Sequence, residues 1–386
     1  MIYLDYAATC PLDSDAGKMY LEVSTDYYGN SSSLHDIGGK ASDLLEGCRG
    51  EMARLLGVEK SGIYFTSGGT ESNFLAITAL LSANKRADKH IITTASEHSS
   101  IHGTMKKLAA DGYSVTYLPL GANGIIDVQM LEACIKPETV LVSIQHVNSE
   151  IGAIQPIEKI GTILKERGIY FHSDMVQSFG KLDIAAISAK VDSLSISSHK
   201  FYGSKGVGLT YISPAIPWTC FLPGTTHENG FRAGTVNIAG IAAMCVAAQK
   251  AVKRLAVDYA HYQALREIVM ELASSTDYLT VFQCGNQLPS IVGMRILGME
   301  GQWTMLECNR RGFAISTGSA CQTGQQAPSK TMKALGLPDE EAKEFVRISF
   351  GRATTIDDVK AFMQAVVSVA TERNALRSIN EAGTKQ

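Results

Sequence analysis

The stretch Val191-Asp192-Ser193-Leu194-Ser195-Ile196-Ser197-Ser198-His199-Lys200 decides the fold class of this chain. Apolar and small side chains alternate over residues 191–197, which predicts a short buried strand. A glycine-punctuated loop follows at residues 201–206, so Lys200 is expected at the end of the strand and inside the fold. Desolvation there would lower the pKa of the amine and make it a nucleophile toward carbonyl groups.

The neighbours of this lysine suggest a phosphate site. Ser197 and His199 alternate with Lys200 and are able to hold a phosphate group. A reactive lysine beside a phosphate site is what an enzyme that uses pyridoxal 5′-phosphate (PLP) needs. The alternative is a lysine that extends its ammonium from the strand end to solvent, and the rest of the chain has to decide between the two.

Composition limits the class of protein. The chain has 386 residues, 45% of them hydrophobic and 19% charged, which is typical of a soluble protein with two domains. The formal net charge of −3 argues against direct nucleic-acid binding, and no apolar run is long enough for a membrane span. The N-terminus lacks a secretory signal, and the eight cysteines form no CxxC pair or metal-ligand cluster. We therefore expect a cytoplasmic protein without a metal site.

Strand–helix units on both sides of Lys200 predict an α/β fold with a mainly parallel sheet. The expected strands cover residues 63–66, 90–94, 115–118, 139–144, 169–174 and, as an edge strand, 208–212. Ligands gather at the carboxyl ends of strands in such sheets. The polar residues that follow the strands are therefore site candidates, namely Thr70, His98, Asn148, Asp174 and Lys200.

Two of these positions leave alternatives open. The Gly68-Gly69-Thr70 turn before a helix predicts an anion site, because a helix start presents free backbone N–H groups, but it also suits a turn capped by Thr70. Asp174 lies on an otherwise apolar strand and needs a cationic partner. That partner is either a protonated pyridine nitrogen or a nearby Lys or Arg.

A change of pattern near residue 257 marks a second domain, so we expect a large domain at 16–256 and a small domain made of 1–15 and 257–386. Its expected strands are 279–282, 290–296, 313–316 and 345–349.

Arg347 can bind the carboxylate of an amino acid or form a structural ion pair, whereas Arg352 is expected to be solvated. Cys321 lies in a loop of small polar residues and is either a reactive thiol or an exposed cysteine without a role. The polar tail from Glu372 is expected to fray.

Taken in order, these stretches resemble the cysteine desulfurases of the NifS/IscS type, within the class V aminotransferases of PLP fold type I. The matching stretches include residues 3–5, 66–73, 96–98, 148–152, 172–174 with Gln177, 197–200, 232–235, 319–321 and 347–349. The resemblance implies a large domain with a mainly parallel, seven-stranded sheet between helices and a smaller α+β domain. Ser329 stands eight positions after Cys321, a spacing that resembles the group with the longer cysteine loop.

The resemblance also implies how the cofactor is held. The residues assigned to PLP are Gly69, Thr70, His98, Asn148, Asp174, Gln177, Ser197, His199, Lys200 and, from the neighbouring subunit of a homodimer, Thr235. Lys200 binds the cofactor covalently and moves substrate protons, and Asp174 pairs with the pyridinium nitrogen. Gln177 hydrogen-bonds the ring hydroxyl, and His98 stacks on the ring and assists proton transfer.

For the substrate, the resemblance implies that Asn148 and Arg347 hold the carboxylate of L-cysteine, with Asn30 nearby. Cys321 takes the sulfur as a persulfide, alanine leaves, and the sulfur passes to an acceptor protein. That acceptor is an iron–sulfur scaffold, a tRNA thiolation enzyme or a dedicated apoprotein. The alternatives are a selenocysteine lyase, another class V PLP aminotransferase, or a scaffold without catalysis that docks sulfur-transfer partners.

Three positions depart from the pattern of the family. Ser31 stands where a proline is common, Cys10 where a second threonine is usual, and Val176 where a smaller residue is usual. None of the three makes or breaks a bond in the implied reaction, so we expect effects on loop rigidity and packing only.

Overall fold

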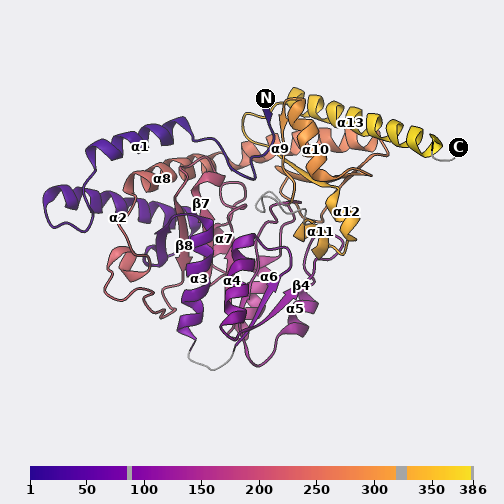
Figure 1. The fold of residues 1–386 in the computed structure, drawn as a ribbon. Helices are drawn as coiled ribbons and strands as arrows, with labels where there is room; N and C mark the ends of the chain where they lie inside the picture. Colours follow the sequence, from indigo (N-terminus) through magenta and orange to yellow (C-terminus); the bar gives the residue numbers. More distant parts are fainter. Residues whose placement is uncertain (85–88, 319–327, 384–386) are drawn as a thin grey trace.

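A mainly parallel sheet between helices forms the larger part of the computed structural model, which describes residues 1–84, 89–318 and 328–383 (Figure 1). Within these residues seven strands pair in the order β2-β8-β7-β6-β5-β3-β4. Their bounds are β2 (Ile63–Thr66), β3 (His90–Thr94), β4 (Ser114–Leu118), β5 (Thr139–Ser143), β6 (Tyr170–Asp174), β7 (Ser193–Ser197) and β8 (Gly208–Ile212). Strands β3 to β7 pair in parallel, which confirms the predicted fold class.

Strand β8 corrects one prediction, because it is not an edge strand. It pairs in the antiparallel direction with both β7 and β2, so the edges of the sheet are β2 and β4. All five residues of β8 are buried, as expected for a strand covered on both faces and paired on both sides. The sequence signal of residues 208–212 was a short strand, and its pairing depends on residues far away in the chain.

Helices cover both faces of this sheet. Their bounds are α1 (Ser14–Asp26), α2 (Asp36–Leu56), α3 (Gly69–Ala83), α4 (Ser99–Ala110), α5 (Val128–Cys134), α6 (Ile157–Glu166), α7 (Ala185–Ser188) and α8 (Ile238–Lys253). Successive strand residues point to opposite faces, so Ile91 joins a core cluster with α3 and α4, whereas Ile92 joins a cluster with α2, α6 and α8. Because both faces are covered, polar strand residues such as Ser193, Ser195 and Thr210 are buried as well.

A smaller part of the chain contains a second sheet and joins the two ends of the sequence. Its antiparallel strands are β9 (Leu279–Val281), β10 (Ile291–Ile296) and β12 (Phe345–Ser349), and β1 (Ile2–Tyr3) pairs in parallel with β11 (Phe313–Ala314). The helices are α9 (Leu255–Ser274), α10 (Gly301–Arg310), α11 (Lys330–Ala334), α12 (Asp339–Lys343) and α13 (Ile356–Gly383). We propose that this part is a separate domain, and the break between α8 and α9 at Arg254 supports a boundary near residue 257.

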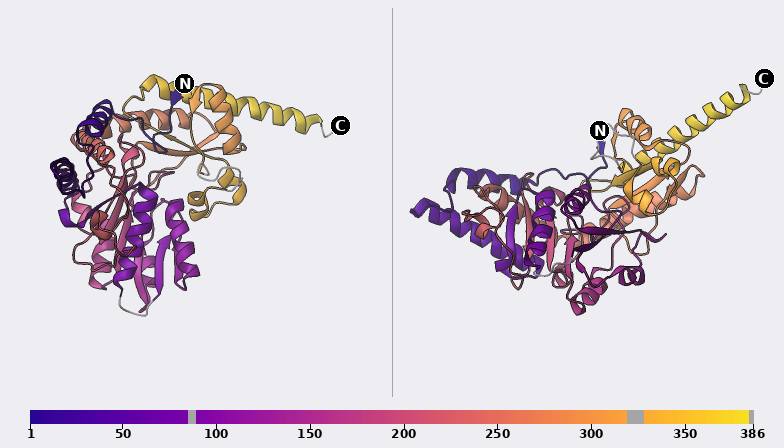
Figure 2. Two further views of the ribbon diagram at one scale, coloured as in Figure 1. Left: turned by 60° about the vertical axis from the view of Figure 1, so that its left-hand side comes forward. Right: turned by 60° about the horizontal axis from the view of Figure 1, so that its bottom comes forward.

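The C-terminal helix differs from the expected fraying tail. Helix α13 continues past Glu372 to Gly383 and extends beyond the small domain in each view (Figures 1 and 2). Its first half packs Val359, Phe362 and Val366 into the small-domain core, which gives the helix a stable base. Within the described part of the chain, no helix combines the length and the apolar character that crossing a membrane requires.

The free edge of β2 is closed by a buried ion pair. Arg49 on α2 donates to the carbonyl of Ile63 at 2.7 Å and to both carboxylate oxygens of Glu228 at 2.8 and 2.9 Å. Glu228 in turn accepts from the backbone N–H of Phe65 at 2.7 Å. Both side chains are almost inaccessible to solvent, at 7% and 1%. The pair thus satisfies the backbone groups that an edge strand leaves open.

Replacing Arg49 by Met should destabilise the protein strongly, because Glu228 would keep a buried charge without a partner. We expect a loss of about 3–5 kcal/mol in the free energy of unfolding, measured by urea denaturation. The matched control is Arg54→Met on the same helix, which removes an exposed pair with Glu51 and should cost less than about 1 kcal/mol. Equal losses in the two variants would contradict a structural role for the Arg49–Glu228 pair.

Candidate active site

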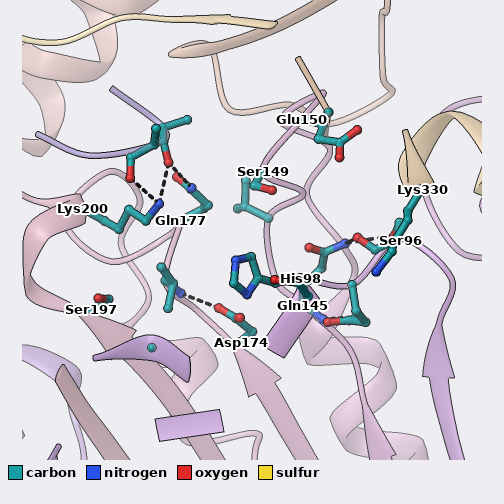
Figure 3. Close-up of a pocket in the computed structure, with 18 of the residues that line it drawn as sticks. Ser96, His98, Gln145, Ser149, Glu150, Asp174, Gln177, Ser197, Lys200 and Lys330 are labelled. Carbon is teal, nitrogen blue, oxygen red and sulfur yellow. Dashed lines mark hydrogen bonds between the residues drawn. The ribbon is translucent and has the colours of Figure 1, made fainter. Parts of the chain in front are cut away.

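A cavity of about 380 Å³ lies where the carboxyl ends of β3, β5, β6 and β7 meet the small domain (Figure 3). Most of the predicted residues line it together, namely Gly69, Thr70, His98, Asp174, Gln177, Ser197, His199, Lys200 and Arg347. Gly69 and Thr70 begin α3, and the residues from His98 to Lys200 lie at or after the carboxyl ends of β3, β6 and β7, so the large sheet brings them to one edge. Arg347 comes from β12 of the second sheet. Four of the five positions expected at this edge, Thr70, His98, Asp174 and Lys200, line the cavity, and Asn148 does not.

Lys200 extends its amine toward the N-terminal segment. The residue follows β7 in a short 3₁₀ turn (Ser198–Lys200), and its Nζ donates to the carbonyls of Ala7 at 2.7 Å and Ala8 at 2.8 Å. In Figure 3 the Nζ of Lys200 lies beside the amide of Gln177. Gln177 Nε2 donates to the same Ala7 carbonyl at 2.9 Å. The backbone of Ala7 thus holds two of the predicted side chains in place.

Asp174 ends β6 and is only 8% exposed. Its oxygens accept from Asn73 Nδ2 at 2.7 Å and from the backbone N–H of Val176 at 2.9 Å. Among the described residues no Lys or Arg lies within ion-pair distance, so the alternative of a structural ion pair is wrong for these residues. A buried carboxylate that is oriented by neutral donors suits a cation supplied by a ligand.

The side chain of His98 faces Asp174 from the start of α4 (Figure 3). Its Nδ1 accepts a hydrogen bond from the backbone N–H of Ser100 at 3.2 Å, so His98 is also the N-cap of the helix. Burial lowers the pKa of His98, and Lys200 and Lys330 lower it further, while the Asp174 carboxylate acts in the opposite direction. His98 therefore presents a neutral ring to the cavity at neutral pH.

The N-terminus of α3 offers backbone donors to the cavity. Gly68 is the N-cap at φ +152° and supplies no side-chain cap, so the helix begins at Gly69 and the predicted cap by Thr70 is wrong. A Cβ on Gly69 would lie 3.0 Å from Val176 Cγ2 and 3.5 Å from Ser197 Cβ, so only glycine leaves this cradle open. Uncapped N–H groups at a helix start bind phosphate well.

His199 lies at the same end of the cavity. Its Nδ1 is 3.0 Å from Thr9 Oγ1, and burial together with Lys200 lowers the pKa of the imidazole to about 4. A neutral His199 is able to act as a hydrogen-bond donor to a phosphate without adding charge. Together, an amine, a carboxylate without a cation and an uncapped helix start fit PLP, in which an aldehyde, a pyridine nitrogen and a phosphate are the matching groups.

Arg347 on β12 reaches the cavity from the small domain, and its guanidinium donates hydrogen bonds to two acceptors. Nη2 donates to Asp5 Oδ1 at 2.6 Å and Nη1 donates to the Ser149 carbonyl at 2.9 Å. Its Nε is buried without a hydrogen-bond partner in the structure. The structural ion pair that the sequence left open thus exists, and an unsatisfied donor remains for a carboxylate.

The predicted solvation of Arg352 is wrong, because this side chain pairs with Asp258 at 2.8 Å and lies over the Tyr202 ring.

Three predicted residues of the described chain do not line this cavity. Asn148 is fully buried behind its wall, where its Oδ1 accepts from the N–H groups of Glu150 and Ile151 at 2.9 Å and its Nδ2 donates to Thr331 at 3.1 Å. Asn30 and Thr235 are exposed. Roles of these three residues in binding stay predictions. Cys321 lies outside the described residues, so its predicted role is not tested by the structure.

Other cavity residues were missed by the sequence argument. Glu97 is 3% exposed, and burial raises the pKa of its carboxyl to about 8, although Gln145 N and Thr94 Oγ1 donate to it. Lys330 and Glu150 also line the cavity. Glu97 and Glu150 lie in the stretches 96–98 and 148–152 that carry the family resemblance. An acidic residue within a segment expected to be buried was the sequence signal that could have identified them as cavity residues. Within the described residues, no group of three or more His, Cys, Asp or Glu side chains lies close enough to hold a metal ion.

Comparisons with known proteins agree on one family. The family model for aminotransferase class V matches residues 2–362. The chain is 49% identical to the NifS protein of Bacillus subtilis (strain 168), covering 94% of this chain and 93% of the relative. It is 37% identical to a protein named cysteine desulfurase IscS from Neisseria meningitidis serogroup C (strain 053442), covering 95% of this chain and 91% of the relative.

Solved structures give the same picture. A structure titled "NIFS-LIKE PROTEIN" superposes with a TM-score of 0.88 at 30% identity, covering 96% of this chain and 99% of the other. A second, titled "SspA in complex with cysteine", superposes with a TM-score of 0.79 at 33% identity, covering 91% and 99%. The residues matched by the class V family model, 2–362, include every residue that lines the cavity.

Replacing Asp174 by Asn should weaken PLP binding, because the variant keeps the shape of the side chain and loses its charge. We expect the dissociation constant of PLP to rise roughly a hundredfold, about 3 kcal/mol, in a titration of apoprotein followed by visible absorbance. Asp192→Asn is the control, because this carboxylate accepts from Phe171 N at the other end of the strands. Unchanged PLP affinity in Asp174→Asn would contradict the assigned partner.

Proposed function

The chain belongs to the aminotransferase class V family and is a PLP-dependent cysteine desulfurase, and from this premise we propose how its own residues divide the reaction. The observation that carries the proposal is the convergence of Lys200, Asp174, the start of α3 and Arg347 on one cavity. An amine, a charge partner, a phosphate cradle and a carboxylate receptor together match the needs of an amino-acid substrate and its cofactor.

We infer that Lys200 is the residue that holds the cofactor and moves protons at the substrate Cα. Its Nζ already faces the cavity from two backbone carbonyls, which position it without neutralising its charge. Bound PLP supplies an electron sink for the negative charge that develops at Cα. The Asp174 carboxylate stabilises the protonated ring nitrogen of the cofactor, and the neutral His98 ring covers one side of the site.

The substrate carboxylate is assigned to Arg347. The ion pair with Asp5 fixes the direction of the guanidinium, and the unpartnered Nε remains as a donor. Asp5 also keeps the buried charge of Arg347 compensated before substrate arrives. A permanent partner of this kind limits the strength of carboxylate binding, which suits an enzyme that must release alanine after every turnover.

The sulfur step is assigned to the Cys321 thiolate. It attacks the sulfur of L-cysteine, so that an S–S bond forms while the Cβ–S bond breaks. The electron pair of the broken bond stays on Cβ, which takes a proton, and L-alanine leaves. The enzyme then carries a persulfide, whose outer sulfur passes to an acceptor protein. An iron–sulfur scaffold, a tRNA thiolation enzyme and a dedicated apoprotein remain the proposed acceptors, with the cytoplasm as the proposed location.

Replacing Cys321 by Ala should separate the sulfur step from cofactor binding. With L-cysteine and a reductant, the parent should release alanine and sulfide in equal amounts, whereas the variant should fall to background and keep its cofactor absorbance. Cys220→Ala is the control, because this exposed cysteine lies outside the cavity lining and should leave both products unchanged. Full sulfide release by Cys321→Ala would refute the persulfide step.

We further propose that the protein is a homodimer whose subunits complete each other's sites. Thr235 and Asn30 are exposed and absent from the cavity lining of their own chain, as expected of residues that serve a partner. Helices α1 and α2 and the loop between them expose large apolar side chains, including Leu21 at 67% and Tyr28 at 69%. Such a patch of apolar side chains on a soluble chain favours a protein–protein contact.

Mixing two inactive variants tests the shared site. Lys200→Ala removes the amine and Thr235→Ala removes the proposed phosphate donor, so each homodimer should lose activity or PLP affinity. After subunit exchange, half of the dimers should be mixed, each with one intact site, and activity should recover to roughly a quarter of wild type. Lys200→Ala mixed with Lys200→Ala is the control. No recovery, although exchange is demonstrated by differently tagged subunits, would refute the shared site.

A further inference from the structure

Beside the cavity, a partly buried lysine, Lys181, lies without a counter-ion among the described residues. Lys181 Nζ donates to Gln177 Oε1 at 2.8 Å, and no ion pair joins it to a carboxylate within the described residues. The pKa of Lys181 is lowered to about 8, mainly by burial, with Cys10 acting in the opposite direction and Arg347 contributing to the decrease. A buried ammonium without an anion destabilises a fold, so its presence calls for an explanation.

The hydrogen bond from Lys181 fixes which way the Gln177 amide points. An ammonium only donates hydrogen bonds, so the amide oxygen of Gln177 must face it. The amide nitrogen must then face the other way, where it donates to the Ala7 carbonyl at 2.9 Å. The same carbonyl accepts from Lys200 Nζ at 2.7 Å (Figure 3). Lys181, Gln177, Ala7 and Lys200 thus form one hydrogen-bonded row that leads into the cavity.

We propose that Lys181 is a positioning residue that locks the Gln177 amide with its N–H groups toward the PLP ring oxygen. The inference rests on the proposed function, since it needs PLP in this cavity with Gln177 at the ring hydroxyl. Without the ammonium, the amide is free to turn by 180°, because its two ends have nearly the same shape. A turned amide would place its oxygen against the ring oxygen, and two acceptors repel each other.

The charge of Lys181 should act on Lys200 as well. The titratable and charged groups around Lys181 and along this row are Tyr6, Cys10, His199, Lys200, Tyr202, Asp258, Tyr262, Arg347 and Arg352. Of these, Asp258 is already paired with Arg254 and Arg352, so it does not neutralise Lys181. The positive charge therefore disfavours a proton on the Lys200 nitrogen in the holoenzyme and lowers the pH at which that proton is lost.

Three variants distinguish the effect of Lys181 on the orientation of the Gln177 amide from the effect of its charge and from a purely structural role. Lys181→Met has a similar length and neither donates nor carries charge, while Lys181→Gln keeps an N–H donor without the charge. Lys165→Met on α6 is the control, because this lysine is exposed and distant from the cavity lining. For each protein we would measure the dissociation constant of PLP, the pH midpoint of the visible absorbance of the holoenzyme, and the Tm of the apoprotein between pH 7 and pH 10.

Lys181→Met should bind PLP roughly ten- to a hundredfold more weakly, and its absorbance midpoint should rise by about one pH unit. Lys181→Gln should recover part of the affinity while its midpoint stays raised. The apoprotein of Lys181→Met should be no less stable than wild type at pH 7. Any stability advantage over wild type should shrink as the pH rises above about 8, where the wild-type lysine loses its buried charge.

Unchanged PLP affinity and an unchanged midpoint in Lys181→Met would overturn the inference. A loss of affinity accompanied by an equal loss of apoprotein stability at pH 7 would also overturn it, because Lys181 would then be merely structural. A wild-type protein that takes up no PLP would overturn the proposed function and this inference together. Since the readouts do not involve Cys321, a failure of the sulfur step would leave them unaffected.

Discussion

The backbone of residues 1–10 holds the reactive groups of both domains in one place. Strand β1 pairs with β11 of the smaller part of the chain, yet the carbonyls of Ala7 and Ala8 accept from Lys200 after β7 of the large sheet. Asp5 pairs with Arg347 on β12, and Thr9 contacts His199. This one N-terminal segment, which turns at residues 6–8, thus contacts the amine, His199 and the carboxylate receptor. Because backbone carbonyls carry no net charge, they orient the amine of Lys200 without forming an ion pair that cofactor binding would have to break.

Charged side chains in and beside the cavity lack an oppositely charged partner in the protein. Asp174 is buried and has no cationic partner among the described residues, and the partly buried Lys181 has no anionic one. His98 and His199 are kept neutral by burial, which reserves positive charge for Lys200, Lys330 and Arg347. Each unpaired charge costs stability in the empty protein, and each becomes favourable once a complementary group is bound. The stability of the core around α2, α3 and α8 compensates for this cost.

Local patterns predicted most elements, because their signals lie within a few residues. Four predicted strands, 63–66, 90–94, 208–212 and 345–349, have the observed bounds, and the Gly68–Gly69 turn marked the start of α3. The edge role of β8 was wrong because pairing depends on distant strands, and Arg352 was misplaced because Asp258 lies 94 residues away. Only Ala16 and Val23 of helix α1 are buried, so the sequence of this helix shows almost none of the apolar periodicity by which a helix is predicted. The Asp5–Arg347 pair joins residues 342 apart, a distance over which spacing in one sequence gives no signal.

The two ends of the cavity have different requirements, and this difference explains where the site residues come from. The phosphate end must hold one cofactor permanently, and it is built from α3, the end of β7 and the rigid turn at Gly68. The sulfur end must exchange a substrate, a product and an acceptor, and it faces Glu150, Pro328 and Lys330 beside the predicted cysteine loop. Behind this end of the cavity, the Asn148 amide holds the backbone of residues 150–151 and the Thr331 hydroxyl together. A rigid wall behind the substrate allows the sulfur end to vary without disturbing the bound cofactor.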